Sequence, residues 1–110
     1  MGDDIAVAIG KRIKERREYL GMSQLEIGAP LEMGRSNVAQ IESGGIKISA
    51  VWLARLADVL RCPVAYFYGD IPPADLEAEE ISVIYRALPA STKPVALAVL
   101  RAMLETSEKG

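Results

Sequence analysis

Apolar residues recur at helical spacing along most of the chain, and no segment shows a convincing strand-like alternation. Each stripe places two to five apolar side chains on one face of a helix of ordinary length. The stripes are Ile9, Ile13 and Leu20; Val38 and Ile41; Leu53, Leu56, Ala57 and Leu60; Leu76, Ile81, Ile84 and Leu88; and Ala96, Val99, Leu100, Met103 and Leu104. The pattern predicts an all-α protein.

Capping and breaking residues divide the first half of this pattern into short helices. The first helix ends at Gly21, and residues 23–26 (Ser-Gln-Leu-Glu) fit the capping box that opens a helix. Pro30 ends that second helix within a residue or two. Gly34 is an acceptable N-cap for the next helix, which stops at residues 44–45 (Gly-Gly). The result is two short helices separated by a brief turn.

The second half of the chain divides at a stiff stretch over residues 69–73 (Gly-Asp-Ile-Pro-Pro). A fourth helix begins near Ser49, and residues 64–68 form an apolar segment that should pack on the preceding helices. Beyond the stretch, helices are predicted at about 74–88 and 92–107, with Pro89 between them. We therefore expect a bundle of about five helices in residues 1–70, followed by a two-helix extension in residues 71–110.

Composition limits the chemistry that this chain can perform. Half of its 110 residues are apolar, it has one cysteine and it has no histidine. These counts remove the commonest general base and the usual zinc ligands, and no nucleophile–base pair or phosphate loop is present. We expect no enzymatic activity, no metal and no cofactor. The first ten residues lack the features of a signal peptide and no run is long enough to cross a membrane, so a cytoplasmic location without membrane contact is expected.

The net charge of −2 does not by itself favour a nucleic-acid partner, but the charges are unevenly distributed. Residues 11–17 carry five basic residues against one acid, and residues 71–110 carry four bases against six acids. A basic face on the first helix could bind phosphates. The alternative is that the cluster is simply the solvated face of a helix.

Two short helices joined by a turn inside a bundle are the layout of a DNA-binding helix-turn-helix. Gly28 would let the two helices approach closely, while Val38 and Ile41 anchor the second one. Residues 9–68 resemble the phage-repressor-like (Cro/C1, XRE-type) helix-turn-helix family. The motifs that carry the resemblance are 9–17 (IGKRIKERR), 21–24 (GMSQ), 38–44 (VAQIESG) and 53–60 (LARLADVL).

The resemblance implies a transcriptional regulator of bacterial or phage type that binds double-stranded DNA, with the helix at about 35–43 in the major groove. Arginine can bind both acceptors of guanine, and asparagine or glutamine can bind the paired acceptor and donor of adenine. The residues that match the family's base-reading positions are Arg35, Ser36, Asn37 and Gln40.

The same comparison suggests contacts with the DNA backbone. Gln24 matches the glutamine that touches a phosphate and braces the recognition helix. The other phosphate-contact candidates are Arg12, Arg16, Arg17 and Lys47. Glu42 is expected to pair with an arginine of the first helix, such as Arg12 or Arg16. The bunched glutamates at 77, 79 and 80 are interpreted as a solvated helix face.

Three residues depart from the family pattern around the turn. Glu32 occupies the place usually filled by glycine, and a positive φ there would cost on the order of 1 kcal/mol. Pro30 shortens the second helix, and Gly34 stands where serine is commoner. These departures concern the geometry of the turn more than the fold.

The two C-terminal helices are too short to form a separate catalytic or ligand-binding domain. Amphipathic helices of this size either cap the bundle or pair with another chain, and a palindromic operator favours a homodimer. The proposed dimerisation residues are Leu97, Leu100, Met103 and Leu104. The alternative function is an antitoxin or protein-interaction adaptor with the same fold and an unidentified protein partner.

Overall fold

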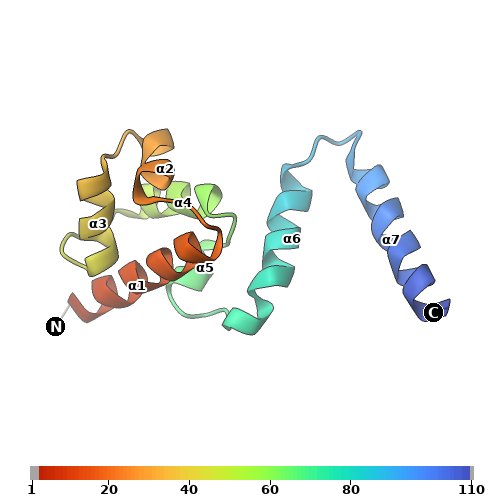
Figure 1. The fold of residues 1–110 in the computed structure, drawn as a ribbon, viewed down its shortest axis with the longest axis horizontal. Helices are drawn as coiled ribbons and strands as arrows, with labels where there is room; N and C mark the ends of the chain where they lie inside the picture. Colours follow the sequence, from red (N-terminus) through yellow and green to blue (C-terminus); the bar gives the residue numbers. More distant parts are fainter. Residues whose placement is uncertain (1–2, 110) are drawn as a thin grey trace.

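The computed structural model describes residues 3–109, and over this range the chain forms seven α-helices, two 3₁₀ helices and no strand (Figure 1). The predicted all-α class is confirmed. The α-helices are α1 (Asp3–Tyr19), α2 (Gln24–Gly28), α3 (Arg35–Ser43), α4 (Ala50–Val59), α5 (Val64–Phe67), α6 (Leu76–Ala87) and α7 (Lys93–Lys109). The 3₁₀ helices span Ala29–Leu31 and Pro73–Asp75.

Local capping chemistry sets the helix ends where the sequence predicts them. The backbone N–H of Glu26 donates to the Ser23 hydroxyl at 3.0 Å, and the Glu26 carboxylate accepts from the Ser23 N–H at 3.1 Å, so the capping box is complete. Gly21 follows α1 with φ +69°, and Gly44 ends α3 with φ +79°. Both positions lie in the left-handed region that favours glycine.

The core lies where α1, α2, α3, α4 and α5 meet. Ile13, Ile27, Leu60 and Phe67 are fully buried there, so the apolar segment after α4 packs on the bundle as predicted. Gly10 lets α1 approach α3 closely, because a Cβ at this position would lie 2.3 Å from the Ile41 carbonyl oxygen. The bundle thus holds α3 by its inner face and leaves its outer face open.

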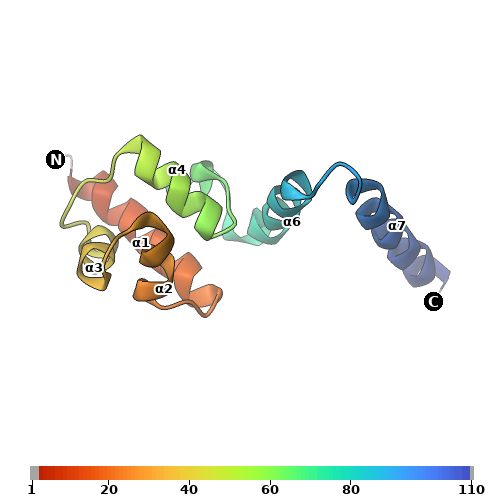
Figure 2. The same ribbon diagram turned by 90° about the horizontal axis from the view of Figure 1, so that it is seen from above.

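The C-terminal helices do not join this core in the same way. Leu76 at the start of α6 is buried against the bundle, and Val83 and Ala87 line a surface hollow together with Ala57 and Cys62. Beyond α6, helix α7 extends away from the bundle, as both views show (Figures 1 and 2). The molecule is accordingly elongated, with principal extents of 52 × 26 × 22 Å.

Candidate nucleic-acid interface

The turn between α2 and α3 is tight, and Gly28 makes it possible. A Cβ on Gly28 would lie 2.6 Å from the Met33 carbonyl oxygen and 2.9 Å from Val38 Cγ2. Glu32 adopts the left-handed conformation with φ 57° and ψ 33°, and its N–H donates to the Ala29 carbonyl at 3.1 Å. Glu32, which stands where glycine is usual, is therefore strained, but the helix-turn-helix around it is intact.

Helix α3 is amphipathic, with an anchored inner face and an exposed outer one. Val38 is 1% exposed and Ile41 is 3% exposed, which fixes the helix on the bundle. The four residues expected to read bases all lie exposed on its first two turns: Arg35, Ser36, Asn37 and Gln40. Gly34 caps α3 without a side chain, so no side-chain hydroxyl or carboxylate occupies the N–H groups of its first turn.

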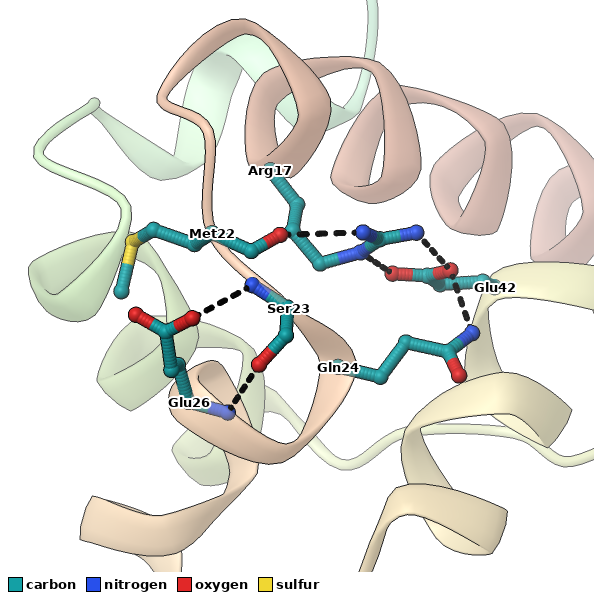
Figure 3. Close-up of polar contacts among 6 residues, drawn as sticks. All are labelled: Arg17, Met22, Ser23, Gln24, Glu26 and Glu42. Carbon is teal, nitrogen blue, oxygen red and sulfur yellow. Dashed lines mark hydrogen bonds and ion pairs between the residues drawn. The ribbon is translucent and has the colours of Figure 1, made fainter.

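Behind this surface, the buried carboxylate of Glu42 joins helices α1, α2 and α3 (Figure 3). Arg17 Nε and Nη2 donate to the two oxygens of Glu42 at 2.6 and 3.1 Å, and Arg17 Nη1 donates to the Met22 carbonyl at 3.0 Å. Gln24 Nε2 donates to Glu42 Oε1 at 3.1 Å. The hydrogen bonds from Glu42 hold the pKa of Arg17 above its usual value, against the opposing effect of burial. This cluster fixes α3 relative to α1 and α2.

The Glu42 cluster corrects one part of the sequence interpretation and supports another. Glu42 pairs with an arginine of the first helix, as expected, but the partner is Arg17 and neither Arg12 nor Arg16. The Arg17 guanidinium is engaged by Glu42 and by the Met22 carbonyl, and its contact with phosphate stays a prediction. Gln24 contacts Glu42 of α3 and so braces the recognition helix; its contact with phosphate stays a prediction.

Arg16 is also engaged in the interior, and its contact with phosphate stays a prediction. It is 2% exposed, and its guanidinium donates to the carbonyls of Leu60 at 2.9 Å and Arg61 at 3.0 Å. Its Nη2 also pairs with Glu80 of α6 at 2.8 Å. Glu80 is accordingly not part of a solvated face, because its side chain is only 19% exposed.

Arg12 is the third arginine of α1 whose guanidinium group is engaged within the protein. Its Nη1 donates to the Phe67 carbonyl at 3.2 Å, and the guanidinium lies over Gly69, where a Cβ would be 2.7 Å from Nη2. Helical geometry places Arg12 on the side of α1 opposite Gly10, which faces α3. The arginines of the basic cluster thus connect α1 to other segments of the protein.

The remaining predicted backbone contact, Lys47, is exposed in the loop after α3. This loop returns past the start of α1, where Ile5, Ile9 and Ile46 line an apolar pocket of about 270 Å³ beside Lys47. Arg35 and Lys47 are therefore the two basic residues on α3 and the loop that follows it. The exposed carboxylate of Glu32 stands in the turn just before them.

The bundle and the exposed α3 together define a class of protein: a five-helix bundle that presents the second helix of a helix-turn-helix. Residues 8–65 match the family model described as "Helix-turn-helix domain". DicA, an HTH-type transcriptional regulator of Escherichia coli, is 30% identical over 115 residues, covering 94% of this chain and 85% of DicA. The chain belongs to the helix-turn-helix family of transcriptional regulators.

Other relatives match a shorter part of the chain. Two proteins named "Uncharacterized HTH-type transcriptional regulator", from Sinorhizobium medicae and Rhizobium meliloti, are each 34% identical over 68 residues. Each match covers 62% of this chain and 49% of the relative, so the chain spans about half the length of these curated relatives. No solved structure matches the chain significantly.

Within residues 3–109, no helix is long and apolar enough to cross a membrane. Among the same described residues, acidic and cysteine side chains do not gather into a group of three that could hold a metal ion.

Proposed function

We propose that this protein is a sequence-specific regulator of transcription that binds duplex DNA with α3 in the major groove. The observation that carries the proposal is the exposed polar row on the first two turns of α3, set opposite a buried face. Arginine, asparagine and glutamine are the side chains best suited to read base edges, and an α-helix fits the width of the major groove. The row is Arg35, Ser36, Asn37 and Gln40.

We propose fewer phosphate contacts than the number of basic residues on α1 would suggest. Lys47 is exposed beside α3, and Gln24 stands at the N-terminus of α2 with its amide held by Glu42. The N–H groups at the start of α3 favour a nearby phosphate oxygen, which would fix the depth of the helix in the groove. Arg17 serves instead to hold the reading helix through Glu42, and Arg16 ties α1 to the end of α4 and to α6.

We further propose that the protein acts as a homodimer on a palindromic operator. Leu100, Met103 and Leu104 of α7 are 46%, 60% and 60% exposed, and Leu97 of the same helix is half-buried. Aliphatic side chains exposed in such a group favour association with another apolar surface. Two bundles held by such a contact would present two copies of α3 to successive major grooves about one helical turn apart.

In vitro selection from a random duplex library tests the proposal, at about 150 mM salt to suppress binding that depends on phosphates alone. The expected product is a palindrome with half-sites roughly 10 base pairs apart. If the folded protein selects no sequence, the DNA-reading proposal fails and the adaptor function takes its place.

The selected operator then tests the role of Arg35. Arg35→Ala should cost about 1–3 kcal/mol on the operator and relax the preference at one base position. Lys11→Ala is the matched control, since Lys11 is an exposed base of α1 that lies beside the linker after α5. A uniform loss on all sequences would instead make Arg35 a phosphate contact.

A further inference from the structure

Helix α6 has a second apolar face that does not touch the bundle. Val83 and Ala87 face the bundle, whereas Ile81, Ile84 and Leu88 lie at helical spacing on the other side. Ile81 is 52% exposed and Ile84 is 42% exposed. A helix buried on one side alone would carry polar residues here, so this face is built to receive another helix.

Helix α7 carries the complementary face but is held away from α6. The two helices diverge from the loop that joins them (Figures 1 and 2). Lys93 Nζ donates to the carbonyls of Leu88 at 2.7 Å and Arg86 at 3.3 Å, and it lies 5.9 Å from the centre of the Tyr85 ring. Through these contacts the first residue of α7 is tied to the end of α6.

The two faces match in register when the helices are placed antiparallel. If residues are counted in both directions from the middle of the loop, Ile81 lies beside Leu100 and Ile84 lies beside Leu97. The 12 residues of α6 span about 18 Å and the 17 of α7 about 25 Å, so α6 can be covered along its whole length. Each α6 therefore has a full apolar partner in an α7.

Charge favours the same pairing. The α6 segment carries three glutamates against one arginine, and the α7 segment carries three bases against two acids. In the antiparallel register, Glu77 falls beside Leu104 and within one turn of Arg101. Opposite net charges favour an α6–α7 contact over an α6–α6 contact.

From these observations we infer that the α6–α7 pairs of two copies exchange: α7 of one copy packs on the outer face of α6 of the other, and the reverse. The inference rests on the homodimer in the proposed function and names its architecture. The exchanged contact would bury Ile81 and Ile84 as well as the α7 residues. The resulting four-helix assembly would be a closed twofold interface in which the same surfaces meet twice.

Disulfide trapping in the full-length protein without DNA tests the exchange. An affinity-tagged Ile81→Cys variant and an untagged Leu100→Cys variant, both carrying Cys62→Ala, are mixed and oxidised mildly. A covalent tagged–untagged dimer is expected, because the exchange brings these positions within disulfide reach. Ser82→Cys in place of Ile81→Cys is the matched control and should give at least tenfold less, since residue 82 lies on another side of α6.

The double variant Ile81→Cys/Leu100→Cys tests the competing arrangement, a closed hairpin in which α7 packs on α6 of the same chain. A disulfide within one chain, running as a monomer on a non-reducing gel, would overturn the exchange. A dimer by sedimentation without the 81–100 cross-link would also overturn it, while leaving the proposed homodimer intact. A monomer by sedimentation would overturn both, and DNA selection would then test the reading function separately.

Discussion

The bundle and α7 contain similar side chains but use them in opposite ways. In the bundle, Ile13, Leu53, Leu60 and Phe67 are at most 1% exposed. In α7, five large apolar side chains are 46–60% exposed: Val95, Val99, Leu100, Met103 and Leu104. Both regions show clear helical periodicity, so spacing identifies which face is apolar but does not identify what covers it. The apolar side chains of the bundle cover one another, whereas those of α7 remain exposed.

The largest difference between the regions should appear when a carboxylate is removed from each. Glu42→Ala leaves the Arg17 guanidinium buried without its partner, and loss of one member of a buried pair costs about 3–5 kcal/mol. Glu105→Ala, at an exposed position of α7, is the matched control and should change stability by less than about 0.5 kcal/mol. Denaturant unfolding measures both, and equal losses would remove the distinction between the regions.

Association should depend on α7 while the stability of the bundle does not. Leu100→Glu places a charge on the exposed apolar face of α7. We expect this variant to form no dimers in sedimentation-velocity experiments at micromolar concentration. Ala98→Glu is the control, because helical geometry places residue 98 among the charged side chains of α7. A Leu100→Glu protein that remained dimeric would contradict the assignment of α7.

Close packing in the bundle should make Gly10 intolerant of a single added methyl group. The Cβ of Gly10→Ala would lie 2.3 Å from the Ile41 carbonyl oxygen and 2.6 Å from that of Glu42, so α1 and α3 must separate. Overpacking of this kind costs about 1–3 kcal/mol. Gly34→Ala is the control, since a Cβ there meets no atom within 4 Å. Thermal unfolding that ranked the two variants equally would refute the argument.

The smallest effect is expected at the turn. Glu32→Gly should stabilise the bundle by about 1 kcal/mol, because glycine adopts a φ of 57° without strain. It should also tighten operator binding by removing a negative charge near the phosphates. Glu32→Gln separates the two causes: it should improve binding without the gain in stability. A stability gain with glutamine would show that charge, rather than backbone strain, destabilises the turn.

Local chemistry made much of the fold and of α3 predictable from the sequence. The capping box at Ser23, the close approach at Gly28 and the left-handed Glu32 all depend on neighbouring residues. The exposed row on α3 followed from the anchoring of Val38 and Ile41. These features lie within one or two helical turns of the residues that specify them, so pattern alone was sufficient.

The partners of the α1 arginines could not be predicted in the same way. Arg16 meets Leu60 across 44 residues and Glu80 across 64, so its role depends on where α4 and α6 cross α1. A cluster of basic residues has the same appearance in sequence whether it faces solvent or carbonyl oxygens. The exposed side of α6 was missed for a related reason, because a single apolar stripe hid two separate faces.

The inward orientation of the α1 arginines has a consequence for how such a regulator would search a genome. With Lys47 as the cation beside the reading helix that is proposed to contact phosphate, a dimer would displace about two counterions, and log K would fall with log salt at a slope of roughly −1.8. Retention on random sequence would then be weak. The protein would reach its operator mainly through free diffusion rather than by sliding, and its occupancy would tolerate swings in intracellular ionic strength.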